Sequence, residues 1–416
     1  MSKCAKCGAC STVCPIYRQT GNEAHTARGK IHLLQELDPR RASPALHELL
    51  DKCLLCGACR ATCPNRIDIP ALVMAARQEL PPRFRLKSFE KYLLTKLLAH
   101  PGLLGGIGFL ARRLPPESGL RYKLALLDDD LARPAPAKAE IAKLCPSAEA
   151  FYFRGCLASH LKPEIATATV HLTAQLRQTA LLPLSGETCC GLAAEAAGNA
   201  VSAKELAKKN IVAATQGEDP AHPRPILTSC ASCFAQLREY PRLLGDDPEW
   251  RGPALAFASR VVELASFLGV TGTSAATSPA QTGEPRLSVL YHDPCHLRFP
   301  ATVPGLAAPG ELLAPPRKLL RQIPHLTLLE FPDGPSCCGQ GGLFSLGQPE
   351  LAQEIAAPLL AACQKLHPDL LLTSCSGCLL QWRQGLRSLH SPTQAEHLAV
   401  FLAARLQTPL APDNNP

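Results

Sequence analysis

Two runs of four cysteines near the N-terminus constrain this chain more than any other feature. The first run has the spacing C-x2-C-x2-C-x3-C, and its members are Cys4, Cys7, Cys10 and Cys14. The second run repeats this spacing, and its members are Cys53, Cys56, Cys59 and Cys63. A proline follows each run directly, Pro15 in one case and Pro64 in the other. The N-terminal segment is therefore expected to be organised around these eight thiols.

The spacing is typical of bacterial ferredoxins that hold two [4Fe–4S] clusters. Three thiolates of a run can surround one cluster, because short gaps with small residues let successive Cβ atoms converge. The fourth cysteine serves the other cluster, and the proline after it turns the chain away. We therefore assign one cluster to Cys4, Cys7, Cys10 and Cys63. The other cluster is assigned to Cys14, Cys53, Cys56 and Cys59.

Structural zinc is the alternative for these cysteines, since zinc also binds paired C-x2-C sequences. Zinc sites use such pairs, however, rather than two runs of four that each end in Cys-Pro. The chain has 20 cysteines among 416 residues, and their spacing indicates metal binding in a reducing compartment rather than a disulfide framework. The first candidate ligand, Cys4, leaves no room before it for a signal peptide. We therefore expect a cytoplasmic protein.

Charge and motif content bear on other classes of function. The formal net charge is +8, but no run of five Lys or Arg residues occurs, and no motif supports nucleic-acid binding. The longest apolar run, residues 102–111, is about half of the roughly 20 residues that a membrane-spanning helix needs. With Arg112 and Arg113 it could touch a partner subunit or the inner face of the cell membrane, or simply pack against a neighbouring domain.

One weak nucleotide motif lies in the same segment. Residues 106–111 fit G-x-G-x-x-A, but a dinucleotide fingerprint needs a preceding strand and a long following helix. The residues before the motif favour a helix rather than a strand, and Pro115 would end any helix that followed it after only a few residues. No P-loop or nucleophile triad is visible. We therefore expect no flavin or NAD on this chain, and we assign no catalytic residue.

The chain after residue 146 is an internal duplication that carries ten more cysteines. Each copy has one cysteine, then Cys-Cys-Gly, then Cys-x-x-Cys, with equivalent positions 139, 148 and 145 residues apart. The first copy contains Cys156, Cys189, Cys190, Cys230 and Cys233. The second copy contains Cys295, Cys337, Cys338, Cys375 and Cys378. The glycines after the paired cysteines, Gly191 and Gly339, are expected to adopt positive φ or to allow close backbone approach.

In each copy the cysteines follow strand-like apolar runs, such as Phe151–Phe153 and Leu370–Thr373, and helix-like stretches lie between the runs. This alternation favours an α/β unit in each half. Helices are also expected at Thr26–Leu37 and Ile69–Glu79. The fold class we expect is α+β and multi-domain, with an α-helical two-cluster ferredoxin module followed by two duplicated α/β cysteine-rich domains. The expected segments are 1–80 (ferredoxin-type domain), 81–145 (helical, Pro-rich linker region), 146–268 and 287–405 (cysteine-rich domains).

Three interpretations of the ten repeat cysteines remain open. Each half holds a metal or an iron–sulfur cluster, or its C-x2-C pair is a redox-active dithiol, or the cysteines are structural. Five cysteines are one more than a cubane uses, and adjacent cysteines can serve two irons of a more open cluster. His292 and His296 flank Cys295, where they suit hydrogen bonds to cluster sulfur or plain capping roles. Cys145 and Cys363 fall outside every motif and are expected to be ordinary cysteines.

These patterns together resemble a known family. The tandem repeat resembles the cysteine-rich (CCG) domains of heterodisulfide-reductase subunits. Joined behind a two-cluster module, it resembles the iron–sulfur subunit of bacterial glycolate oxidase and of related D-lactate dehydrogenases. The resemblance covers nearly the whole chain, and the stretches that carry it are residues 27–31, 291–297 and 336–342.

The resemblance implies an electron-transfer subunit of an oxidoreductase complex. A partner FAD-containing subunit would oxidise glycolate or D-lactate, and electrons would pass through the clusters to a quinone or another carrier. The resemblance also implies that each half could hold a non-cubane [4Fe–4S] cluster on its five cysteines. Both C-x2-C pairs of this chain are complete, whereas in glycolate oxidase subunits the C-x2-C pair of the second copy often retains only one of its two cysteines. The alternative function is therefore a heterodisulfide-reductase-like thiol–disulfide oxidoreductase with catalytic non-cubane clusters.

Overall fold

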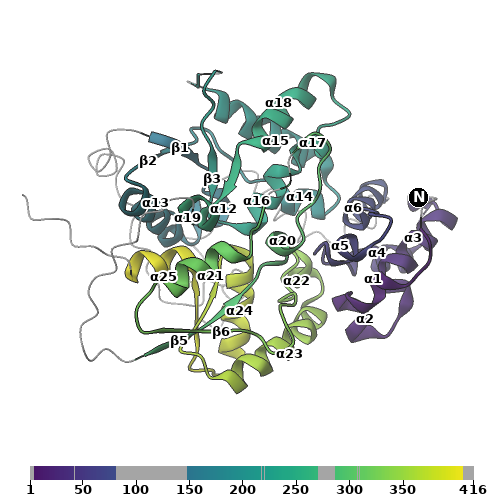
Figure 1. Cartoon of the computed structure of the whole chain (residues 1–416). Coiled ribbons are helices and arrows are strands. Elements are labelled where there is room, and N and C mark those ends of the chain that lie inside the picture. The colour runs from purple at the N-terminus through teal and green to yellow at the C-terminus, as the bar shows by residue number, and fades with distance from the viewer. Residues whose placement is uncertain are drawn as a thin grey trace, which may run out of the picture.

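The described part of the chain forms a small helical unit and two α/β units (Figure 1). The computed structural model describes residues 4–80, 148–269 and 286–405, except residues 42, 217, 220, 307 and 309. The linker expected at 81–145, with its G-x-G-x-x-A match and Cys145, lies wholly outside the described residues, as does most of the second linker at 269–286. Within the described ranges, no helix is long and apolar enough to cross a membrane.

Short capped helices build the N-terminal unit. They are α1 (Ala9–Thr12), α2 (Pro15–Thr20), α3 (Ala27–Glu36), α4 (Pro44–Asp51), α5 (Ala58–Thr62) and α6 (Ile69–Glu79), with 3-10 turns η1 (Glu23–His25) and η2 (Pro39–Arg41). The side chains of Thr26, Ser43 and Asp68 accept hydrogen bonds from the first turns of α3, α4 and α6, where a helix leaves N–H groups free. The helices predicted at Thr26–Leu37 and Ile69–Glu79 are confirmed as α3 and α6.

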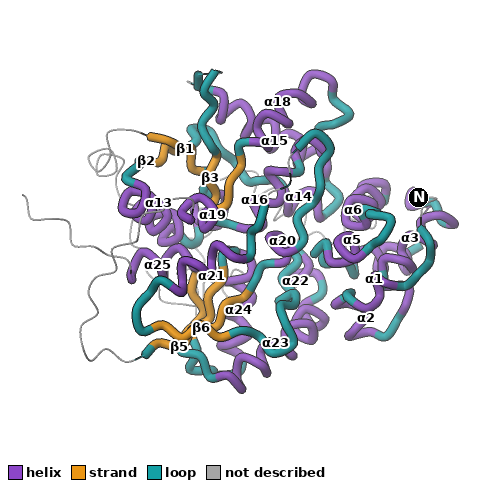
Figure 2. The backbone as a smooth tube through the Cα atoms, in the orientation of Figure 1, coloured by secondary structure: helices purple, strands orange, loops and turns teal. Residues whose placement is uncertain are grey.

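Each α/β unit contains a four-stranded parallel sheet (Figure 2). The first has the order β2-β1-β3-β4, with β1 (Ala148–Tyr152), β2 (Ala180–Pro183), β3 (Ile226–Thr228) and β4 (Val261–Glu263). The second has the order β6-β5-β7-β8, with β5 (Leu287–His292), β6 (Leu326–Leu329), β7 (Leu370–Thr373) and β8 (Gln394–His397). The two orders are equivalent. The predicted α+β class with a duplicated α/β unit is therefore confirmed.

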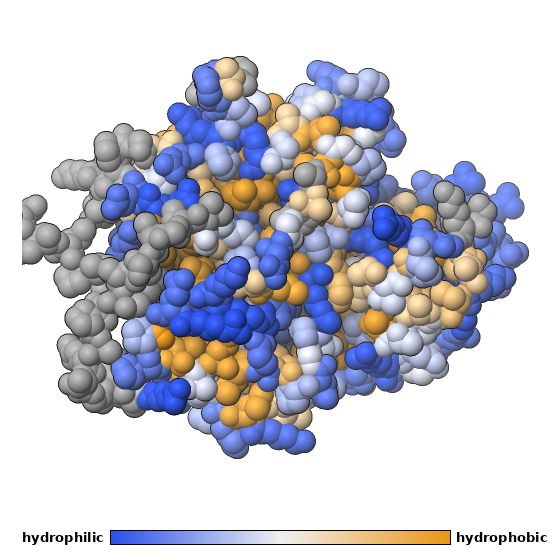
Figure 3. Space-filling view, viewed as in Figure 1, coloured by the Kyte–Doolittle hydropathy of each residue, from blue (hydrophilic) through white to orange (hydrophobic). Residues whose placement is uncertain are grey.

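Helices connect the strands, as parallel pairing requires. The first unit contains α12 (Gly155–His160), α13 (Pro163–Arg177), α14 (Leu192–Ala196), α15 (Ala200–Thr215), α16 (Ala231–Arg238), α17 (Tyr240–Leu243), α18 (Pro248–Ser259) and α19 (Leu264–Gly269). The second contains α20 (Cys295–Arg298), α21 (Ala314–Arg321), α22 (Phe344–Gly347), α23 (Pro349–Leu366), α24 (Ser376–Ser388) and α25 (Leu398–Arg405). Hydrophobic residues also gather on the surface over the second unit, between polar ones (Figure 3).

The two α/β units share one hydrophobic core, in which residues from both sheets are packed. The backbone N–H of Ala231 donates to the carbonyl of Ser374 at 2.9 Å, which joins the start of α16 to the loop before α24. Equivalent tyrosine–serine pairs lie inside each unit, Tyr152 with Ser229 at 2.9 Å and Tyr291 with Ser374 at 3.0 Å. The carboxyl ends of the two central strand pairs therefore meet, and this is the region where the repeat cysteines lie.

Glu263, the last residue of β4, is a buried acid near this junction. Its side chain is 1% exposed, and its Oε2 accepts a hydrogen bond from the Ser266 N–H at 3.0 Å, whereas Oε1 has no partner among the described residues. Burial disfavours a charged carboxylate and raises the pKa of Glu263 to about 7. The folded protein therefore holds a proton here that the unfolded chain has already lost near neutral pH.

Replacing Glu263 with glutamine is expected to remove a pH-dependent loss of stability. Because the folded-state pKa is raised, the stability from Glu263 is present at pH 4 and is lost as the pH rises towards about 7. At pH 8 the Glu263→Gln protein should be more stable than the parent by up to about 3 kcal/mol, and at pH 4 the two should be equal. Urea unfolding followed by tryptophan fluorescence at both pH values measures the difference. Equal stabilities of the two proteins at pH 8 would contradict this account.

Candidate metal centres

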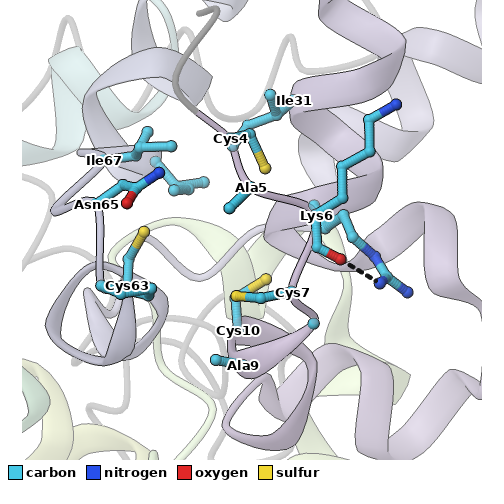
Figure 4. A pocket seen from close by; sticks show the side chains of 14 residues that line it. Cys4, Ala5, Lys6, Cys7, Ala9, Cys10, Ile31, Cys63, Asn65 and Ile67 are labelled. Carbon is cyan, nitrogen blue, oxygen red and sulfur yellow. Dashed lines mark hydrogen bonds between the residues drawn. The ribbon is translucent and has the colours of Figure 1, made fainter.

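The first hollow in the N-terminal unit is lined by four cysteines from both runs (Figure 4). Cys4 and Cys7 lie on the N-terminal loop, Cys10 lies in α1, and Cys63 follows α5. Gly8 has a φ of 82° at the start of α1, a conformation that glycine adopts without strain, and it directs the loop around the hollow. The structure thus brings together the four cysteines that the sequence assigned to one cluster.

The second hollow is lined by the complementary four cysteines, Cys14, Cys53, Cys56 and Cys59. Burial raises the pKa of the Cys56 and Cys59 thiols, so these thiols are protonated at neutral pH unless a metal displaces the protons. None of the nineteen described cysteines forms a disulfide. Thiols that converge without bonding to one another are the donor set that an iron–sulfur cluster requires, so the residues fit the group.

A buried lysine lies beside the second hollow. Lys30, from α3, is 2% exposed and donates a hydrogen bond to the carbonyl of His25. Burial lowers the pKa of Lys30, and the neighbouring Cys53, Cys14 and Cys59 act in the opposite direction by favouring its charged form. A cation in this position compensates negative charge on the sulfur ligands. The first hollow instead has exposed Lys6 and half-buried Arg28 beside it.

The repeat cysteines of the first α/β unit converge on one buried site. Their thiols contact one another in the order Cys156, Cys189, Cys190, Cys233 and Cys230. Cys230 precedes α16 and follows the end of β3, as expected for a site at the carboxyl edge of an open sheet. Gly191 follows the paired cysteines with a φ of 92°, which confirms the positive φ predicted there.

The second α/β unit repeats the arrangement. Its thiols contact one another in the order Cys295, Cys337, Cys338, Cys378 and Cys375. Gly339 has a φ of 87°, and a Cβ there would lie 2.4 Å from the Ala352 carbonyl oxygen, so only glycine fits. Cys363 lies apart from this site, fully buried within α23. Each half therefore gathers the five cysteines that the sequence grouped, and whether they ligate metal stays a prediction.

The two repeat sites touch each other, which the sequence analysis did not predict. The thiols of Cys230 and Cys375 are in contact across the junction of the two units. Ser232 Oγ lies 3.2 Å from Cys375 Sγ and 3.0 Å from His296 Nδ1. Burial lowers the pKa of His296 to about 4, so this imidazole is neutral at pH 7. Sequence reasoning had no signal for this contact, because it depends on how the two sheets pack against each other.

The second hollow of the N-terminal unit also adjoins a repeat site. Burial and then the nearby Cys295 thiol raise the pKa of Cys56, and both cysteines pack against a small hydrophobic cluster that contains Leu54 and Cys337. The eighteen cysteines of the four sites therefore form one series through the molecule. It runs from the first hollow to the second, then to the second repeat site and finally to the first repeat site.

Comparison with known proteins agrees with this arrangement. A family described as 4Fe-4S dicluster domain matches residues 1–67, and one described as cysteine-rich domain matches residues 150–238 and 289–383. Over 96% of its length, the chain is 29% identical to a probable glycolate oxidase iron-sulfur subunit of Bacillus subtilis, of which it covers 92%. It is 30% identical to lactate utilization protein A of Exiguobacterium over 60% of this chain and 95% of that protein. The chain therefore belongs to the family of iron–sulfur proteins that includes lactate utilization protein A and joins a 4Fe-4S dicluster domain to a duplicated cysteine-rich domain.

The family match and the hollows together support [4Fe–4S] binding and an electron-transfer role for this iron–sulfur protein.

The N-terminal unit is held against the α/β units by buried cations. Arg77, from α6, is 7% exposed and donates to the carbonyls of Leu50, Asp51 and Cys53 within its own unit. It also donates to the carbonyl of Ala196 in the first α/β unit at 2.6 Å.

Two further contacts fix the same interface. Arg60 donates to the carbonyl of Phe299 at 2.8 Å. A Cβ at Gly57 would lie 2.9 Å from the same oxygen, and a Cβ at Gly198 would lie 2.6 Å from the Arg77 carbonyl oxygen. Both glycines have φ near 80°, so glycine is favoured by conformation as well as by space.

Replacing Arg77 with alanine is expected to loosen the N-terminal unit. The buried carbonyls of Leu50 and Ala196 and the partly buried carbonyls of Asp51 and Cys53 would lose this donor. Each unsatisfied buried group costs about 1–3 kcal/mol, so the unit should be destabilised by about 2 kcal/mol or more. Arg77→Lys should rescue only part of this, because an ammonium cannot reproduce the planar fork of donors. Limited proteolysis within residues 1–80 measures the loosening, with exposed Arg41→Ala as the control. If Arg77→Ala and Arg41→Ala are cleaved at equal rates, Arg77 does not hold the interface.

Proposed function

We propose that this protein is the iron–sulfur electron-transfer subunit of a flavin-dependent 2-hydroxy acid dehydrogenase complex that oxidises glycolate or D-lactate. The observation that carries the proposal is the series of four thiol sites, each next to another. A relative similar over nearly the whole chain is named a probable glycolate oxidase iron-sulfur subunit. A partner FAD-containing subunit performs the hydride chemistry, and a quinone or other carrier accepts the electrons.

In this proposal the N-terminal unit, residues 1–80, holds two cubane clusters. Cys4, Cys7, Cys10 and Cys63 hold the first, and Cys14, Cys53, Cys56 and Cys59 hold the second. The cysteine-rich domains, 146–268 and 287–405, each hold a further, non-cubane cluster on their five thiols, because adjacent cysteines can serve two irons of an open cluster. When bound, the clusters accept and release single electrons. The chain's own residues hold them in series.

The protein is proposed to work in the cytoplasm, with a peripheral position at the inner face of the cell membrane when the acceptor is a quinone. Affinity purification of the tagged chain from its native host tests the complex. An FAD-containing partner should co-purify, and the complex should oxidise glycolate or D-lactate while the chain alone does not. If the chain alone reduces a disulfide substrate and no flavoprotein co-purifies, the thiol–disulfide oxidoreductase function replaces this proposal. The direct contact between Cys230 and Cys375 is the observation that favours this second candidate.

Serine substitution is expected to reveal the crossed ligand sets. Cys63→Ser should damage the cluster held by Cys4, Cys7 and Cys10, although Cys63 lies in the other run. Each cubane carries four irons, so the loss should approach about four irons per chain. Iron analysis and electron paramagnetic resonance of the reduced protein measure it. Cys363→Ser, a buried cysteine outside every site, is the matched control and should keep its full iron content. An intact first cluster in Cys63→Ser would refute the crossed assignment.

Lys30→Gln is expected to lower the reduction potential of the second cubane. A reduced cluster carries one more negative charge, which the buried ammonium stabilises, so its loss should shift the potential down by on the order of 60 mV, a tenfold change in a one-electron equilibrium. Potentiometric titration followed by electron paramagnetic resonance measures the shift. Lys52→Gln is the control, because Lys52 lines the same hollow but is paired with Glu48 at 2.7 Å near the surface. Equal potentials in the two variants would show that Lys30 is uncharged.

A further inference from the structure

His292 is a buried imidazole beside the cysteines of the second repeat site. It is the last residue of β5 and is 1% exposed. Neither ring nitrogen meets a nitrogen or oxygen partner among the described residues, and the imidazole interacts with the Cys338 thiol, a weak hydrogen-bonding group. Burying a polar group with so weak a partner costs free energy, so its presence calls for a ligand that binds nitrogen.

The ring of His292 faces two cysteine thiols. One ring nitrogen and the sulfurs of Cys338 and Cys378 all lie within 4.8 Å of one another, and all three residues are buried. Two aromatic rings fix the orientation of the imidazole. Trp382 packs at a centroid distance of 5.4 Å and an angle of 69°, and Phe331 packs at 6.3 Å and 87°. The nitrogen is thus held in place beside the sulfurs by side chains that bind no metal themselves.

The first α/β unit lacks this donor. Cys156 and Cys295 are equivalent in the duplication, and His292 stands three residues before Cys295. The residue three positions before Cys156 is Phe153, which is fully buried and has no ligand atom. The two sites therefore share five thiols each but differ in one donor, so they need not hold metal in the same way.

We propose that His292 is a nitrogen ligand to the metal of the second repeat site, which makes that site mixed nitrogen–sulfur. The proposal rests on the proposed function only in that the second repeat site holds metal. Imidazole and thiolate together suit two metals. They bind zinc tetrahedrally, and histidine also replaces cysteine on one iron of Rieske clusters. In either case Cys338 and Cys378 give up their thiol protons to solvent, and His292 binds in its neutral form.

The test uses the full chain, purified without oxygen and labelled with ¹⁵N-histidine. If iron is the metal, pulsed electron paramagnetic resonance should detect a strongly coupled, directly bound histidine nitrogen. If zinc is the metal, X-ray absorption at the zinc edge should show mixed nitrogen and sulfur ligation. In His292→Phe, which copies the first half, the nitrogen signature should be lost. In His292→Cys, a thiolate should keep the metal bound while the nitrogen signature disappears.

A matched control removes another buried histidine of the same half. His397 is 1% exposed, its Nδ1 accepts the Ala399 N–H at 3.2 Å, and the thiol near it is Cys230 of the first site rather than Cys338 or Cys378. His397→Phe should keep the nitrogen signature. The proposal is overturned if the parent shows only the weak nitrogen coupling of a hydrogen bond, or if the signature persists in His292→Phe. Cys338→Ser with Cys378→Ser separates the two proposals, because unchanged metal content there would instead refute metal in this half.

Discussion

The contact between Cys230 and Cys375 is the constraint on which the rest of the structure depends. Parallel strands place all their carboxyl ends at one edge of a sheet, and each repeat site lies at such an edge. Two such sites can meet only if the two sheets present these edges to each other. The shared hydrophobic core and the hydrogen bond from Ala231 to Ser374 hold them in this arrangement. A linear chain of domains would have kept the sites apart.

Electrostatics differ along the series of sites. The second hollow has the buried amine of Lys30 beside it, whose charged form the neighbouring cysteines favour although burial lowers its pKa, whereas the junction of the repeat sites contains neutral imidazoles. Burial lowers the pKa of His296 and of His397 to about 4. A fixed cation stabilises a reduced, more negative cluster, and a neutral imidazole does so much less. The protein therefore sets different surroundings for chemically similar sulfur sites, which is how it could order their potentials.

Much of this was accessible from the sequence because the signals were local. The cysteine spacing predicted the two sets of four that line the hollows, and hydrophobic periodicity predicted α3 and α6. Positive φ at Gly191 and Gly339 followed from the Cys-Cys-Gly sequence. The contact between the repeat sites could not be predicted, because it arises from packing between residues more than 140 positions apart. From the sequence, His292 and His296 were also given the same two possible roles, a hydrogen bond to cluster sulfur or a capping role. The structure separates them, since His296 bonds to Ser232 while His292 faces Cys338 and Cys378.

The duplicated halves are not interchangeable, and their differences lie where each half meets the other. Glu263 and His397 occupy equivalent ends of β4 and β8, paired with Thr228 and Thr373. Glu263 of the first half lies near Tyr291 of the second, and His397 of the second lies near Cys230 of the first. Each half thus supplies part of the other's surroundings. A half separated from its neighbour would keep its thiols but lose these surroundings. Because each half contributes to the surroundings of the other, two sites that began as identical copies can acquire different properties.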